Sequence, residues 1–408
     1  MAATFRNLTA ERDSKPTAND PPEDVVALKA VRGLLLITTI LIATGLTMLY
    51  SASYGTAGLK YFRNQLIWVA LGIIGAVTVF VIGYRQLAKQ YKLWLVAALA
   101  GLIACLFFDE INGAKRWIQL GFFSIQPSEF AKVAMALYVA KYCTDFPRTF
   151  SLLFNRRGLI YPFGVTALAI IGAILMGQDL GTTVLVAAMT FLTLLAAGLY
   201  WRYLLVIPAV IGAAALYIIN FDPMRLARAT SFMNPEQFKT EDGYQLWNSL
   251  MALGSGSWCG IGFMKSRMKA KYLPDAHTDF VVAIVGEELG FIAILLLLLL
   301  YTLFGYFALK IALNARSRLG TLLGFALTFG ILLQAAINLL VVSGSAPTKG
   351  MPAPFLSYGG SNMIACLIGV GLLVSIAMDT IAPDYQEELQ NKFLPWRRKD
   401  GSDAKREN

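Results

Sequence analysis

Long runs of apolar residues, separated by short polar segments, dominate the chain. Five of these runs contain no charged side chain: 33–50, 64–84, 158–178, 180–201 and 203–221. A helix that crosses the core of a bilayer needs about 20 apolar residues. The length and number of the runs exclude the buried helices of a soluble domain. The pattern therefore predicts an all-α membrane protein.

The complete pattern predicts about ten transmembrane helices. The fourth is the least regular, because Glu129, Lys132 and Lys141 lie within it, and the eighth begins with an acidic interruption. The ten predicted spans are approximately 33–50, 64–84, 93–108, 127–143, 158–178, 180–201, 203–221, 280–309, 319–343 and 361–380.

Lysine and arginine residues indicate the orientation, because cytoplasmic loops are enriched in them. With the N-terminus in the cytoplasm, most of the 35 Lys and Arg residues lie on the cytoplasmic side. An even number of spans then returns the C-terminus to the same side. We expect a disordered cytoplasmic tail over 1–32, a membrane domain over 33–380 with one large extracytoplasmic loop (222–279) between spans 7 and 8, and a cytoplasmic tail over 381–408. The first span is expected to stay as an anchor, because its apolar run is too long for a cleaved signal peptide.

The composition agrees with this class of protein. Of 408 residues, 57% are hydrophobic and 15% are charged, whereas about 25% are charged in soluble domains. The net charge of +10 does not indicate nucleic-acid binding, because the charges lie between the spans. The four cysteines have neither metal-site nor disulfide spacing, so we expect them to be inert apolar side chains.

Four polar connections on the predicted outer face contain unusual residues. Ordinary structural roles are available: Lys115, Arg116 and Trp117 could be an interfacial anchor, and Asp179 could cap a helix. Tyr358 could lie in a plain turn. The concentration of these segments on one face favours a functional site. The four connections are 112–117 with 126–130, the turn 177–182, the loop 222–279, and 347–361.

The loop 222–279 is the densest of the four. Its glycines between 254 and 262 allow close backbone approach. Positive residues then alternate at every second position, which in an extended segment puts four cations on one side. This pattern indicates either a solvated or lipid-binding loop, or a site for an anionic group such as pyrophosphate. The four cations are Lys265, Arg267, Lys269 and Lys271.

Acidic residues follow at the end of this loop. Asp279 lies at the N-terminal mouth of the eighth span, where the helix dipole favours an ionised carboxylate; a simple capping role for Thr278 or Asp279 is the alternative. His277 is the only histidine, and one histidine makes no metal site. Glu287 and Glu288 lie about 12 Å deeper at 1.5 Å per residue. Acids at that depth usually face a polar interior, so they either pair with cations or line a cavity.

At these residues the chain resembles the SEDS family of peptidoglycan glycosyltransferases, which includes the FtsW, RodA and SpoVE proteins. The matching segments occur in the order that the family has, and with the ten spans the resemblance covers nearly everything except the tails. The segments are 112–117, 126–130, 179–182, 243–245, 273–280, 286–290 and 347–361.

The resemblance implies that the protein polymerises lipid II, a disaccharide-peptide on undecaprenyl pyrophosphate, into glycan strands by an inverting transfer. Asp279 matches the essential carboxylate of the family, so we assign it the role of base. Mg²⁺ or Mn²⁺ could assist the departure of pyrophosphate, and the sequence indicates no metal ligands. The candidate substrate-binding residues are Lys115, Arg116, Trp117, Gln126, Asp179, Lys265, Arg267, Lys269, Lys271, His277, Glu287, Lys349, Ser357 and Tyr358.

The resemblance also implies partners and a location. We expect a class B penicillin-binding protein, other division-machinery proteins and membrane lipids as partners, at the division septum of a bacterial inner membrane. Residues 347–350 look like the division-type FtsW branch. Gln178, Asn362 and 351–355 depart from the family pattern, so an elongation-type RodA role stays open. A lipid II flippase and a non-catalytic scaffold are alternatives from other classes, and the clustering of polar residues on the outer face argues against both.

Overall fold

The structure is a computed structural model. It describes residues 23–110, 113–119, 121, 123–147, 150–152, 157–221, 223–233, 235–240, 243–274, 276–348 and 350–393. Lys349 and residues 1–22 and 394–408 lie outside the described residues, as does most of each predicted tail.

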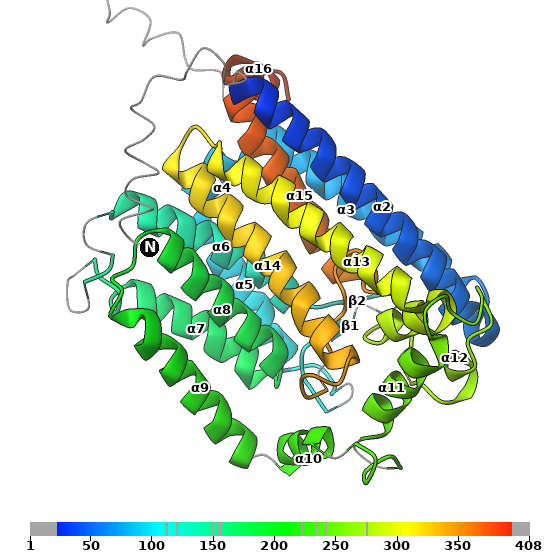
Figure 1. Cartoon of the computed structure of the whole chain (residues 1–408). Helices are drawn as coiled ribbons and strands as arrows, with labels where there is room; N and C mark the ends of the chain where they lie inside the picture. Colours follow the sequence, from blue (N-terminus) through cyan, green and yellow to red (C-terminus); the bar gives the residue numbers. More distant parts are fainter. Residues whose placement is uncertain are drawn as a thin grey trace, which may run out of the picture.

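The described chain is almost entirely helical (Figure 1). One short hairpin, β1 (Ile118–Gln119) and β2 (Ser124–Ile125), pairs antiparallel, with Ile118 opposite Ile125. The helices are α2 (Glu23–Ala57), α3 (Lys60–Ile82), α4 (Tyr84–Lys89), α5 (Tyr91–Cys105), α6 (Pro127–Asp145), α7 (Phe163–Met176), α8 (Leu180–Ala196), α9 (Tyr203–Phe221), α10 (Pro223–Met233), α11 (Tyr244–Gly256), α12 (Met268–Lys271), α13 (Val281–Leu313), α14 (Arg318–Val342), α15 (Gly360–Ile381) and α16 (Pro383–Phe393).

Each predicted span coincides with a helix. Five helices (α2, α3, α13, α14 and α15) are long and apolar enough to cross a membrane, and four more are shorter apolar helices. The irregular fourth span is α6, which begins with Pro127 at its first turn, a position that proline favours. Its charges are paired: Lys132 with Glu129 at 2.6 Å, and Lys141 with Asp145 at 2.6 Å.

One prediction needs correction. Helix α2 begins at Glu23, so residues 23–32 are helical and not a disordered tail. The predicted C-terminal tail begins with a further helix, α16. The loop 222–279 contains three helices, α10, α11 and α12.

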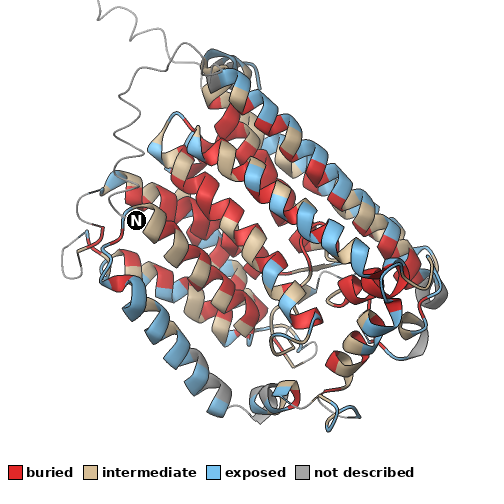
Figure 2. Ribbon diagram, in the orientation of Figure 1, coloured by how far each residue is buried: buried red, intermediate tan, exposed pale blue. Residues whose placement is uncertain are grey.

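The buried centre of the molecule consists of α6, α14 and α15, whereas α9 is exposed over most of its described length (Figure 2). Helices α10, α11 and α12 gather at one end of the bundle, and α4 and α16 lie at the opposite end (Figure 1). We call the first of these the α12 end. At the α16 end, the Tyr84 hydroxyl donates to Asp379 at 2.8 Å, and Arg85 pairs with the same carboxylate at 2.7 Å.

Helix α13 is interrupted at Gly290, whose φ of 82° and ψ of −177° only glycine adopts readily. The segment 256–262 fills the interruption. The amides of Ile261 and Gly262 each donate to carbonyls of α13, those of Glu287 and Glu288, at 3.0 Å. The amide of Phe291 donates to the Ser257 carbonyl at 2.9 Å. The broken helix therefore leaves these backbone groups hydrogen-bonded, as an apolar environment requires.

Candidate active site

Asp279 lies two residues before α13, at the α12 end of the bundle. Phe280 occupies the N-cap position of this helix, so neither Thr278 nor Asp279 is its N-cap residue. The backbone of Asp279 is fixed by Asn338 of α14, which donates from its amide to the Asp279 carbonyl at 2.8 Å. The Asp279 carboxyl group is half-buried.

Arg116 and Asp279 both lie next to Gly350, although the three residues are far apart in the sequence. A Cβ atom placed on Gly350 would be 3.0 Å from Asp279 Oδ2 and 3.0 Å from Arg116 Nη2. The carboxylate and the guanidinium therefore both border the space into which a side chain at position 350 would project. Arg116 Nη1 also donates to the Gly350 carbonyl at 3.4 Å. Its buried Nε finds no hydrogen-bond acceptor among the described residues.

Aromatic rings gather around His277, two residues before Asp279. His277 stacks on Tyr61 of α3, with ring centroids 4.4 Å apart, and Tyr358 meets Tyr61 edge-on at 5.0 Å. The Tyr358 amide donates to the His277 carbonyl at 3.0 Å. Burial raises the pKa of the Tyr358 phenol, so this residue stays protonated at neutral pH. The predicted residues His277 and Tyr358 are thus brought together beside Asp279.

Asp179 caps α8. Its Oδ1 accepts the Thr182 amide at 3.0 Å, and its Oδ2 accepts from Gln126 at 3.0 Å and from Ser128 at 3.2 Å. Both oxygens of this buried carboxylate are occupied by protein donors. The structure therefore gives Asp179 a capping role and binds Gln126 and Ser128 to its carboxylate.

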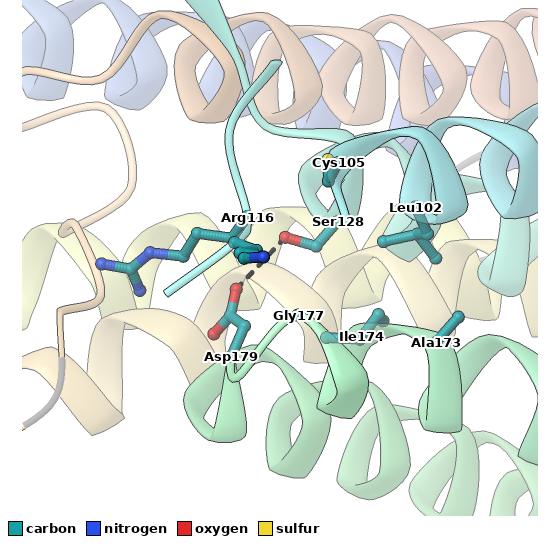
Figure 3. Close-up of a pocket in the computed structure, with 9 residues that line it drawn as sticks. Leu102, Cys105, Arg116, Ser128, Ala173, Ile174, Gly177 and Asp179 are labelled. Carbon is teal, nitrogen blue, oxygen red and sulfur yellow. Dashed lines mark hydrogen bonds between the residues drawn. The ribbon is translucent and has the colours of Figure 1, made fainter. Parts of the chain in front are cut away.

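A small pocket lies beside this cap. Lys115 and Arg116 line it together with Ser128 and Asp179, and apolar side chains of α5 and α7 form its floor. In Figure 3, Ser128 and Asp179 point toward each other, whereas the Arg116 guanidinium extends away from them. Arg116 therefore connects the pocket to the space beside Asp279.

A buried polar network lies beneath the site. Lys132 of α6 donates to Gln334 of α14 at 2.5 Å, and Gln334 donates to Asn362 of α15 at 3.0 Å. Asn338, one turn along α14 from Gln334, bonds to both the Asp279 carbonyl and the Met351 carbonyl. The network fixes the loop 343–359 and Asp279 to the three most buried helices.

The four alternating cations do not form one positive face. Residues 268–271 are helical, so an alternation of two does not place these side chains on one side. Lys269 pairs with Glu288 at 2.5 Å, and the backbone amide of Arg267 donates to Glu287 at 2.9 Å. Glu288 is thus paired with a cation, as one of the two expectations had it. Glu287 is bound instead by the Ser266 hydroxyl and by backbone amides of the same segment.

The remaining predicted residues are scattered. Ser357 is buried in a turn, where its hydroxyl accepts the Ala353 amide at 2.8 Å. Trp117 is half-buried beside Arg116, and Lys265 is exposed in the segment before α12. Lys271 ends α12, and its side chain is not among the described ones.

The chain was also compared with known proteins. A family model described as "Cell cycle protein", FtsW/RodA/SpoVE, matches residues 32–381. The chain belongs to this family. Every site residue named above lies within the matched range, and so does the whole helical bundle from α3 to α15.

Relatives within the FtsW/RodA/SpoVE family match over most of their length. A probable peptidoglycan glycosyltransferase FtsW of Tolumonas auensis is 39% identical, over 92% of this chain and 96% of that protein. One of the same name from Trichlorobacter lovleyi is 34% identical, over 84% of this chain and 92% of that protein. A chain in the structure described as "Structural coordination of polymerization and crosslinking by a peptidoglycan synthase complex" has a TM-score of 0.72 and 27% identity, covering 86% of this chain and 98% of that one. The protein is therefore a helical, multi-pass membrane protein of this family.

Sequence reasoning missed several residues of the site, including Gln334, Asn338 and Tyr61. Gln334 and Asn338 are four residues apart in an otherwise apolar span, which places both amides on one face of a helix. That spacing was a usable signal. The sequence gives no comparable signal for Tyr61, because its ring contacts His277 only in the folded structure.

Proposed function

We propose that this protein is a peptidoglycan glycosyltransferase that polymerises lipid II into glycan strands for septal cell-wall synthesis. The observation that carries the proposal is the placement of the Asp279 carboxylate and the Arg116 guanidinium next to the same position, beside Gly350. A transfer from a diphosphate donor needs a base beside the attacking hydroxyl and positive charge beside the leaving group. The relatives named peptidoglycan glycosyltransferase support this chemistry.

In the proposed orientation, ten helices cross the membrane, both termini are cytoplasmic, and 222–279 faces the periplasm or cell exterior. The distribution of Lys and Arg along the sequence supports it. Asp279, Arg116 and the His277 ring all lie at the α12 end, which this orientation puts outside. Lipid II carries its sugars on that side once it has been translocated.

The proposed reaction is a single displacement with inversion. The acceptor 4-hydroxyl attacks the anomeric carbon of the donor, Asp279 takes the hydroxyl proton, and a new C–O bond forms. The bond between the anomeric carbon and the undecaprenyl diphosphate breaks, and the diphosphate leaves with the bonding electrons. Arg116 and Lys115 stabilise the charge that develops on it.

In the proposed reaction, Arg116 and Lys115 stabilise the leaving group. Mg²⁺ or Mn²⁺, held by the diphosphate with one or two carboxylates, would assist its departure. Among the described residues, no three histidine, cysteine or acidic side chains come together as a ready-made ion site.

The proposed partner is a class B penicillin-binding protein that crosslinks the new strands at the septum. The similar chain of known structure comes from a complex that combines polymerization and crosslinking, as its description says. The curated relatives named FtsW favour a division role over a RodA-type elongation role.

The proposal is tested with purified full-length protein, its class B partner and lipid II. We expect glycan polymer to accumulate, resolved by gel electrophoresis. Transport of lipid II across vesicle membranes without any polymer would instead support the flippase alternative and contradict the proposal.

A further inference from the structure

Two adjacent carboxylates are buried in α13, about two turns beyond Asp279. Glu287 is 1% exposed and Glu288 is not exposed at all. Charged groups in such a position are costly unless every oxygen is bound by a donor. Neither carboxylate takes part in the reaction proposed above, so the burial of two acids at this position needs a separate explanation.

Glu288 is surrounded by donors from two distant parts of the chain. The Ser51 hydroxyl of α2 donates to both of its oxygens, at 2.8 and 2.6 Å. Lys269 donates to Glu288 Oε1 at 2.5 Å and to Ser51 at 2.8 Å. The backbone amides of Met264 and Ser266 donate to it at 3.0 and 3.3 Å.

Glu287 holds the same segment from the neighbouring position. Its oxygens accept the Ser266 hydroxyl and the backbone amides of Arg267 and Met268, at 2.9 and 3.4 Å for the amides. The segment 264–269 is therefore wrapped around the two carboxylates through its main chain. Backbone donors of this kind fix a conformation more closely than side chains alone, because they have no rotamers of their own.

These contacts close a short loop that contains Asp279. One end of the loop is 264–269, the other is Glu287 and Glu288, and Asp279 lies between them at the start of α13. The segment that precedes this loop also packs directly against α13. A Cβ on Gly256 or Gly260 would overlap the backbone of that helix. Movement of 264–269 would therefore be transmitted to Asp279 along the chain.

We propose that Glu287 and Glu288 are positioning residues, which clamp the segment 264–269 so that Asp279 is held in one place relative to Arg116. The clamp rests on the proposed function, because it acts on the base of that reaction. Its effect is on the rate of the chemical step and not on the binding of lipid II.

The test compares Glu288→Gln and the double variant Glu288→Gln/Lys269→Met with wild type, in the lipid II polymerisation assay. The double variant leaves no unpaired buried charge, so it keeps the protein folded where the single variant does not. A glutamine has one acceptor oxygen instead of two, so some of the donors from 264–269 lose their partner. We expect kcat to fall at least about tenfold with KM for lipid II unchanged, and hydrogen exchange to rise in 264–279 alone.

Glu388→Gln, the same substitution at an exposed acid of α16, serves as the control and should keep the wild-type kcat. A wild-type kcat for the folded double variant would overturn the clamp. The clamp would also be overturned if a lower fraction of folded protein accounted for the whole loss of kcat and hydrogen exchange rose throughout the chain. If the wild-type protein itself made no polymer, the proposed function would fail, and the exchange measurement would still report on the clamp.

Discussion

At the scale of single residues, the site depends on a glycine that leaves room for two charged groups. The Asp279 carboxylate and the Arg116 guanidinium both lie close to Gly350, whose carbonyl accepts from Arg116. A Cβ atom at position 350 would lie 3.0 Å from an atom of each group, so a side chain there would displace at least one of them.

We expect Gly350→Ala to lower the rate of lipid II polymerisation by at least about tenfold, because displaced reacting groups lose rate steeply. The melting temperature should change little, since the residue lies in a loop. Gly359→Ala is a matched control from the same loop, where the added Cβ meets its nearest neighbour at 3.6 Å. Equal activity of the two variants would contradict the need for a glycine at position 350.

The sequence alone predicted part of this site. The identities of Asp279, Arg116 and Lys115, and their location at one end of the bundle, followed from the pattern of spans and from the family resemblance. The closeness of Gly350 to these groups did not, because it depends on a contact between residues 234 positions apart. The arrangement of the four cations was not predicted for a related reason. The backbone of their segment folds around Glu287 and Glu288, and residues 268–271 form a helix, so the four side chains do not lie on one side.

At the scale of elements, the broken helix α13 is the main departure from a simple bundle. Its apolar run predicted one continuous span, and Gly290 gave no sign of interrupting it. The interruption exists because the segment 256–262 supplies the hydrogen bonds that a continuous helix would supply itself. The glycines of that segment were read correctly as sites of close backbone approach.

We expect Gly290→Ala to lower the melting temperature of the detergent-purified protein. An alanine in that backbone conformation costs roughly 1–3 kcal/mol, and its Cβ would also overlap residues 258–260. Gly172→Ala in α7 is the control, since no atom lies within 4 Å of its added Cβ. A melting temperature for Gly290→Ala equal to that of wild type would show that the interruption is not required.

At the scale of the whole molecule, the two ends of the bundle have different chemistry. The α12 end carries Asp279, Arg116 and the aromatic rings, and the α16 end carries the cluster of Tyr84, Arg85 and Asp379. The proposed function requires the α12 end to face outward. The order and approximate extent of the spans could be predicted from hydrophobicity, whereas the packing of α14 and α15 at the centre could not, because their apolar patterns resemble those of the outer helices.

We expect Lys239→Cys, in a Cys259→Ser background, to react with a membrane-impermeant thiol reagent applied to the outer surface of the membrane. Glu388→Cys in the same background should react only after the membrane is opened, because it lies on α16 at the other end. Both positions are exposed in the structure, so burial does not explain a difference. The reverse pattern of labelling would contradict the orientation.

The most direct measurement is the rate of lipid II polymerisation by Asp279→Asn, a substitution that keeps the shape of the side chain and removes the base. Asp384→Asn on the exposed surface of α16 is its control. The account predicts that Asp279→Asn folds and binds its partner but polymerises at least about a hundredfold more slowly than wild type, while Asp384→Asn is unaffected. Polymerisation by Asp279→Asn at the wild-type rate would contradict it.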